Sequence, residues 1–125
     1  MMALTSVHFG HLPVWINGNA YFNGALPSSK EKDNLVDTEN KVSVSLEEKD
    51  GRIYLKTNVL DFLKDFEDGI ITSDILGKAF EPEQRFENPD GTAITFDSDY
   101  YGGHRGLSTI PGPFASKEAL DKPVW

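Results

Sequence analysis

Alternation of apolar and polar residues is clearest in two runs, KVSVSLEE and RIYLKTNV, which are separated by the residues KDG. Val44 and Leu46 alternate with serine and glutamate in the first run, and Ile53 and Leu55 alternate with tyrosine and lysine in the second. Successive side chains of a strand point to opposite faces, so this pattern predicts a β-hairpin with one apolar face toward a core. The KDG residues supply its turn.

Weaker patterns predict further short elements. HLPVWINGNAYFNGALP places Val14, Ile16, Ala20 and Phe22 at even positions around an NGN turn, which indicates two short strands. In NVLDFLKDFEDG the apolar residues Leu60, Leu63 and Phe66 are three positions apart, and Gly69 follows as a plausible stop. This pattern predicts a short helix.

The stretch after this helix is rich in β-branched residues and turns. IITSDILGKAF predicts one strand or two, with Ser73 and Asp74 available for a turn. The residues Asn88-Pro89-Asp90-Gly91 predict a turn, because proline and glycine occupy the positions that a type I turn favours. TAITFD is then expected to return as a strand, with Ile94 and Phe96 facing inward.

Short strands at hairpin spacing, with one short helix, favour antiparallel β structure over alternating βαβ units. We therefore expect a mainly β chain, a small antiparallel β-sandwich or β-roll. Its 125 residues are the size of one domain, so 1–125 is predicted as a single unit. Within it, the polar stretch 28–41 is predicted as a surface loop, and 111–125 as a proline-containing tail.

The charge of the chain restricts its partners. Twenty acidic and twelve basic residues give a formal charge of −8, the wrong sign for binding nucleic acid or anionic membranes. The absence of cysteine excludes disulfides and thiolate chemistry. The amino-terminal residues do not have the pattern of an export signal, and the sequence leaves localisation open.

The acidic residues after the predicted turn suggest a cation site. Asp97 and Asp99 are two apart, so an extended backbone places them on one face, and Asp90 can approach from the turn. Oxygen clusters of this kind suit calcium, although the spacing lacks the later glutamate of a helix-loop-helix calcium loop. The alternative is that these carboxylates cap backbone amides or pair with Arg105. No other cofactor is predicted.

Aromatic residues on polar faces and in loops are a second candidate site. Tyr54 alternates with Ile53 and Leu55, and the adjacent Tyr100 and Tyr101 cannot both point inward. Exposed aromatic rings can stack on sugars while polar side chains such as Arg105 bind hydroxyls. The alternative is that these rings lie at the edge of the core with their hydroxyls in water. The hypothetical ligand-binding residues are thus Tyr54, Tyr100, Tyr101 and Arg105.

The phrases ENPDG at Glu87–Gly91, DSDYYG at Asp97–Gly102 and PGPF at Pro111–Phe114 occur in an order that resembles a known group of proteins. The chain from Val14 to Phe114 resembles the carboxy-terminal region of bacterial right-handed parallel β-helix proteins, many of which degrade polysaccharides. The resemblance implies an accessory β-domain that packs against or follows the last coil. The active site of such proteins lies in the β-helix, so no catalytic residue is carried over. A secreted or periplasmic location is implied if the chain belongs to a larger protein of this kind.

Three functions remain open at this point. The favoured one is a non-catalytic accessory β-domain associated with carbohydrate-processing proteins, with an oligosaccharide or a β-helix domain as partner. The second is a structural cap or interaction module for a β-solenoid. The third is a small glycosidase or lyase that uses Asp97 and Asp99, whose spacing permits a carboxylate pair.

Overall fold

The structure is a computed structural model that describes residues 15–63 and 65–125. Within these residues the strands form three two-stranded sheets. The strands are β1 (Ala20–Tyr21), β2 (Leu35–Val36), β3 (Val44–Lys49), β4 (Arg52–Thr57), β5 (Asp68–Gly69) and β6 (Ser108–Thr109). The helices are α2 (Val59–Leu63), α3 (Ser73–Leu76) and the 3₁₀ helix η1 (Lys117–Asp121). The prediction of a mainly β chain with antiparallel pairs is confirmed, and the structure adds a parallel pair, β1 with β2.

The β3–β4 hairpin forms as predicted. Asp50 and Gly51 have φ values of 53° and 72°, the two positive values that a tight hairpin turn requires. Leu46 lies opposite Leu55 in the register. The predicted burial of the apolar face is wrong for β3, because Val44 and Leu46 are 66% and 69% exposed. The buried cluster packs against Leu55 on β4 and leaves β3 outside it.

The core is small and is built around α2. Leu60 and Leu63 lie one turn apart and are buried together with Phe114 and Ala119. Lys117 Nζ donates to Asp61 Oδ1 at 2.6 Å, which ties η1 to α2. The predicted helix is therefore real but shorter than expected. It ends at Leu63, and Gly69, the predicted stop, belongs to β5.

The stretch predicted as one or two strands after β5 contains a helix instead. Thr72 has extended backbone angles, and its hydroxyl accepts a hydrogen bond from Ile75 N at 3.4 Å, as an N-cap residue does. Ser73 is 1% exposed; its Oγ donates to Phe86 O and accepts from Ile94 N at 2.7 Å. The Thr72 cap and the burial of Ser73 therefore override the β propensity of the isoleucines.

The turn at Asn88–Gly91 is confirmed by a hydrogen bond from Gly91 N to Asn88 O at 2.9 Å. The prediction of a strand after it, at 92–97, is wrong. This segment forms only isolated β-bridges, among them the bridge of Thr95 with Thr72. The segment that carries Thr72 cannot continue as its partner strand, because α3 begins at the next residue, Ser73. Phe96, predicted to face inward, is 60% exposed, whereas Ile94 is half-buried.

The predicted surface loop 28–41 also contains structure. It includes β2, and Glu31 within it is buried. The tail lies along the hairpin, since Val124 N donates to Ile53 O at 2.8 Å and Ile53 N donates to Trp125 O at 2.9 Å. Ala20 and Phe22 of the predicted amino-terminal strands pack against the core, and Val14 lies outside the described residues.

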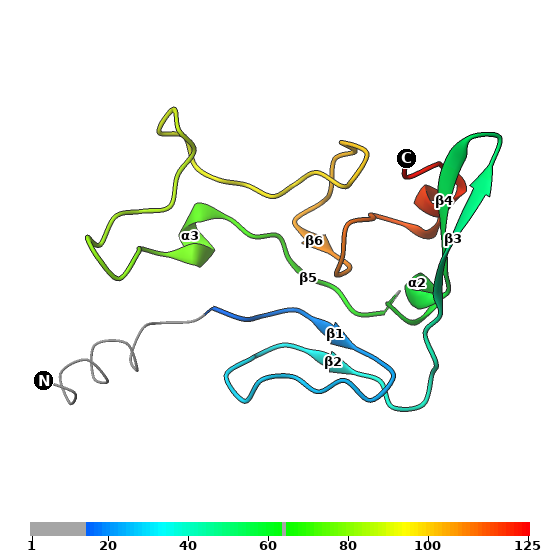
Figure 1. Ribbon diagram of the computed structural model, residues 1–125. Coiled ribbons are helices and arrows are strands. Elements are labelled where there is room, and N and C mark those ends of the chain that lie inside the picture. The colour runs from blue at the N-terminus through cyan, green and yellow to red at the C-terminus, as the bar shows by residue number, and fades with distance from the viewer. Residues whose placement is uncertain (1–14, 64) are drawn as a thin grey trace, which may run out of the picture.

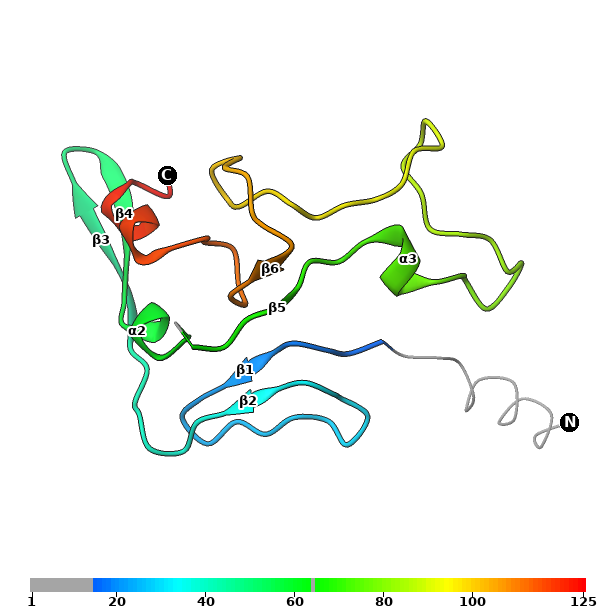
Figure 2. The same ribbon diagram turned by 180° about the vertical axis from the view of Figure 1, so that it is seen from behind.

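The elements are spread along the molecule (Figures 1 and 2). The β3–β4 hairpin, η1 and the carboxyl terminus lie at one end, and the segment around α3 lies at the other. β5 and β6 lie between them, above β1 and β2 in the view of Figure 1. Residues 15–19, just before β1, thus run beside the chain around β5. None of the helices in the described ranges has the length and apolar character needed to cross a membrane.

Candidate functional site

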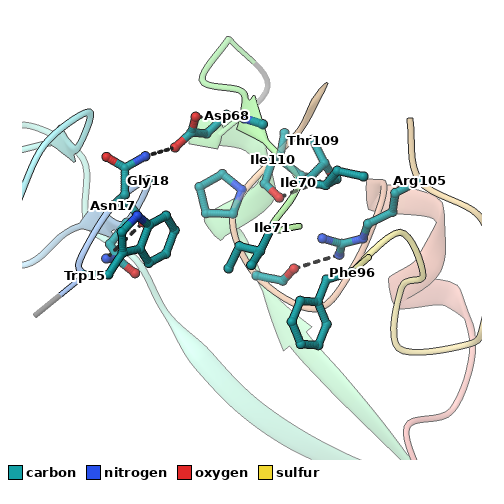
Figure 3. A pocket seen from close by; sticks show the side chains of 14 residues that line it. Trp15, Asn17, Gly18, Asp68, Ile70, Ile71, Phe96, Arg105, Thr109 and Ile110 are labelled. Atoms are coloured by element: carbon teal, nitrogen blue, oxygen red, sulfur yellow. Dashed lines mark hydrogen bonds between the residues drawn. The ribbon is translucent and has the colours of Figure 1, made fainter. Parts of the chain in front are cut away.

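A pocket of about 260 Å³ lies where three segments of the chain meet. The residues before β1 supply Trp15 and Asn17, the β5 segment supplies Asp68 and Ile71, and the returning chain supplies Arg105. The antiparallel pairing of β5 with β6, in the register Asp68 to Thr109, holds the last two segments together. Figure 3 shows the side chains that line this pocket.

The first segment is fixed to β5 through Asp68. Asn17 Nδ2 donates to Asp68 Oδ2 at 2.7 Å, and Asp68 Oδ1 accepts from the backbone of Gly69. Gly18 lies directly against this carboxylate and has a φ of +69°. A carboxylate that accepts only these bonds still has lone pairs for a ligand hydroxyl.

Two exposed aromatic rings flank the opening. Trp15 is 47% exposed and Phe96 is 60% exposed. In Figure 3, Trp15 lies on the same side as Asn17, whereas Phe96 lies across the pocket with Ile71 and Arg105. Apolar rings beside hydroxyl-binding groups are the combination that binds a pyranose, whose ring has an apolar face and a polar edge.

Arg105 forms the far wall and is held by the backbone around it. Its Nη2 donates to Gly112 O at 2.7 Å, and its backbone N donates to Asp97 O at 2.6 Å. Its Nε is buried without a hydrogen-bond partner among the described residues. Since the guanidinium has five N–H donors, part of its donor capacity remains for a ligand.

A buried carboxylate supports the rim of the pocket. Glu31 accepts hydrogen bonds from Tyr21 Oη and from Asn19 Nδ2, the latter at 2.7 Å. Burial raises the pKa of Glu31, but these hydrogen bonds outweigh burial and hold its pKa below the ordinary value. The hydrogen bond between Tyr21 and Glu31 also raises the pKa of Tyr21. Glu31 thereby fixes Asn19, which lines the pocket.

Of the four ligand-binding residues predicted from sequence, Arg105 lines this pocket. Tyr100 and Tyr101 hold the carboxy-terminal tail: Tyr100 Oη donates to Val124 O at 2.7 Å, and Tyr101 Oη lies 3.2 Å from Lys122 O. Burial of Tyr101, with the nearby Tyr100 and Asp99, raises its pKa. Tyr54 lines a different, polar pocket of about 260 Å³ between the hairpin and the end of η1.

The three carboxylates of the predicted calcium site bind different partners: Asp90 belongs to the turn at 88–92, and Asp97 and Asp99 belong to the loop 97–105. Asp90 Oδ1 accepts from Thr92 Oγ1 at 2.7 Å, a bond that with the Thr92 amide lowers the pKa of Asp90. Asp99 Oδ1 accepts from Gly103 N at 2.7 Å, and Asp97 Oδ2 lies 3.5 Å from His104 Nδ1. Across the ranges that the structure describes, no three acidic, histidine or cysteine side chains are grouped to hold a metal ion.

Sequence reasoning misses most of the pocket. Trp15 and Phe96 are visible as aromatic residues, but alternation predicts Phe96 in the core. The pattern around Asn17 and Gly18 predicts only a turn, and Asp68 only precedes the predicted end of a helix. No local spacing in the sequence links residues 51 positions apart, so nothing local identifies the contact between Asn17 and Asp68.

Comparisons with known proteins give one informative match. No protein-family model matches the chain, and no curated protein matches it significantly. A solved structure described as the complex structure of XylC with xylose matches it with a TM-score of 0.68 and 36% sequence identity. The match covers 82% of this chain and 16% of the XylC chain. The chain therefore spans a small part of the length of that protein.

This likeness confirms part of what the sequence predicts. The chain has a carbohydrate-related structural neighbour, since the matching structure contains xylose. The accessory role and the β-helix partner stay predictions.

Proposed function

We propose that the chain is a non-catalytic accessory β-domain that binds a neutral sugar of the xylose type in the pocket between Trp15 and Arg105. The observation that carries this proposal is the combination of exposed rings, a carboxylate and a guanidinium around one cavity. The likeness to a xylose-bound structure supports the choice of sugar. The volume of about 260 Å³ is just below the usual range of about 300–1,000 Å³ for ligand pockets and suits a single sugar ring.

Each wall of the pocket has a distinct role in this proposal. The indole of Trp15 stacks on the apolar face of the sugar ring. Asp68 accepts hydrogen bonds from ring hydroxyls, and Arg105 donates to a hydroxyl oxygen on the other side. Asp68 offsets the charge of Arg105 within the pocket, and the overall charge of −8 disfavours an acidic sugar, so a neutral sugar is expected.

Tyr100 and Tyr101 contribute indirectly in this account. Tyr100 N donates to Pro113 O at 2.7 Å, and Phe114 stacks on Tyr101 with ring centroids 6.0 Å apart. These contacts fix the loop around Arg105 to the segment 111–114, whose first two residues complete the pocket wall. We expect their substitution to alter the position of Arg105 rather than to remove a direct sugar contact.

The test is thermal unfolding of the whole chain with xylose and xylotriose, and with glucuronic acid as the acidic comparison. A ligand at 100 times its Kd stabilises a protein by about 2.7 kcal/mol, so a shift of several degrees is expected with the neutral sugars. Asp68→Asn should remove the shift. Asp65→Asn, at an exposed position outside the pocket, should leave it unchanged.

Two outcomes would reject the proposal. One is the absence of a shift with every neutral sugar at millimolar concentration. The other is an equal shift in the Asp68→Asn and unmodified chains. Release of free xylose from xylotriose, measured in the same samples, would instead support the glycosidase alternative, and the accessory role predicts that none is released.

A further inference from the structure

A second surface of the molecule lies on the hairpin, away from the sugar pocket. All six residues of β3 are exposed. Val44 and Leu46 alternate with polar residues and so lie on one face of the strand, the face that Leu55 shares across the hairpin. We call Val44, Leu46 and Glu48 the β3 face. Apolar side chains exposed to this extent on an ordered strand mark a contact surface.

The β3 face continues into an apolar groove of about 350 Å³. Val44 and Leu55 form one side of this groove. Across it lie Phe22, from the chain after β1, and Phe114. The floor includes Leu63, which is 3% exposed and belongs to the core cluster. A chain that filled the groove would thus extend the existing core rather than create a separate one.

The two edges of the hairpin differ. The outer edge of β4 is occupied by the tail, through the hydrogen bonds of Ile53 with Val124 and Trp125. β3 pairs with β4 alone among the described strands. A strand with an unpaired edge and an apolar face is the site at which another strand can add.

The sequence of β3 argues against a second copy of this chain as the occupant. Glu47 and Glu48 lie in the second half of the strand, so antiparallel pairing of two copies in a register centred on either residue would place like carboxylates opposite each other. The charge of −8 on each chain adds to this repulsion. A partner with a basic side chain opposite Glu48 and apolar side chains opposite Val44 and Leu46 would match the β3 face.

The comparison with XylC indicates where such a partner comes from. The region that matches this chain is 16% of the XylC chain, so in that protein it is accompanied by a much longer polypeptide. We propose that the β3 face and its groove dock onto the polypeptide that accompanies this region in a XylC-like protein. The contact is apolar at Val44 and Leu46 and electrostatic at Glu48. Val44 and Leu46 do not line the sugar pocket, although the groove beside them shares Asn19, Pro111 and Gly112 with that pocket.

The test uses the part of XylC outside the matched region as the probe, expressed as a tagged polypeptide and titrated with the whole chain described here. The Val44→Lys/Leu46→Lys variant should bind this probe at least tenfold more weakly than the unmodified chain. The matched control is Leu26→Lys/Leu107→Lys, because these leucines are 76% and 85% exposed and lie away from the hairpin. It should bind as the unmodified chain does. Equal binding by both variants, or no binding by the unmodified chain to a folded probe, would overturn the proposal.

Two further measurements keep the test decisive if the XylC polypeptide does not fold alone. An apolar dye should fluoresce with the unmodified chain and the control variant, and much less with Val44→Lys/Leu46→Lys. An unchanged dye signal would overturn the proposal. Light scattering should give a monomer for the unmodified chain. A dimer that Val44→Lys/Leu46→Lys dissociates would overturn it as well, by identifying a second copy as the occupant.

Discussion

Gly18 lies against the carboxylate of Asp68 so closely that a Cβ atom at position 18 would stand 2.3 Å from Asp68 Oδ2. The backbone of Gly18 also has a φ of +69°, which side-chain-bearing residues rarely adopt. A side chain at position 18 would therefore displace the Asp68 carboxylate and strain the backbone of the segment that carries Trp15 and Asn17. The contact between Gly18 and Asp68 closes the sugar pocket on one side.

Substitution of this glycine should affect both stability and binding. Gly18→Ala is expected to lower the free energy of unfolding by about 1–3 kcal/mol, because of its backbone conformation and the displaced carboxylate. It should also weaken xylotriose binding at least tenfold. Gly24→Ala is the matched control, since Gly24 has a φ of +86° and a Cβ added there would meet no atom within 4 Å. Denaturant unfolding and titration of both variants check this, and equal sugar affinity in the two would contradict the role of Gly18.

Substitution of Ser73 should destabilise the chain more than substitution of an exposed serine does. The Ser73 hydroxyl joins Phe86 O and Ile94 N, and the side chain is 1% exposed. Ser73→Ala leaves two partly buried backbone groups without this partner and should destabilise the chain by about 1–3 kcal/mol. Ser45→Ala, on the exposed strand β3, should change stability by less than about 0.5 kcal/mol. Urea unfolding compares them; equal midpoints would contradict the proposed role of Ser73.

Substitution of Leu63 tests whether the small buried cluster around α2 is the core of the described residues. Leu63 is 3% exposed and packs with Leu60 and Phe114. Leu63→Ala should lower the free energy of unfolding by about 2–5 kcal/mol, a loss that a chain with so few buried side chains among its described residues is not expected to tolerate. Leu107→Ala, at an 85% exposed position, should be close to neutral. Circular dichroism during heating checks both, and a folded Leu63→Ala chain with an unchanged melting temperature would contradict this account of the core.

The pH dependence of stability should depend on Glu31. Its pKa in the folded chain is below the ordinary value of 4.5. A carboxylate with a lowered folded pKa stabilises the protein above about pH 4.5, and this contribution is lost as the pH falls through the folded pKa. Glu31→Gln should therefore reduce the loss of stability below about pH 4.5. Exposed Glu39→Gln is the control. If both variants lose stability with acid as the unmodified chain does, Glu31 does not have this role.

The sequence predicts those elements whose cause is local. The β3–β4 hairpin follows from alternation and from a turn at Asp50 and Gly51, and the Asn88–Gly91 turn follows from its own residues. Helix α3 could not be predicted in the same way. Its isoleucine and the two before it favour a strand, and the helix is stabilised by Thr72 as a cap and by contacts of Ser73 with residues 13 and 21 positions away.

The candidate site is predicted only in part for the same reason. Arg105 is identified as a polar residue near exposed aromatics, and it does line the pocket. Its neighbours Trp15 and Asp68 come from distant parts of the chain, and their proximity depends on Gly18 and on the pairing of β5 with β6. The predicted burial of β3 is wrong because alternation shows which face is apolar, not whether anything covers it.

The two tryptophans provide the most direct test of sugar binding. Trp15 lines the pocket, whereas Trp125 is 88% exposed at the carboxyl terminus and does not. Xylotriose should be titrated calorimetrically into the unmodified chain, Trp15→Ala and Trp125→Ala. The proposed function predicts binding to the unmodified chain and to Trp125→Ala, and at least tenfold weaker binding to Trp15→Ala. Equal affinity in all three, or no heat of binding in any, would contradict it.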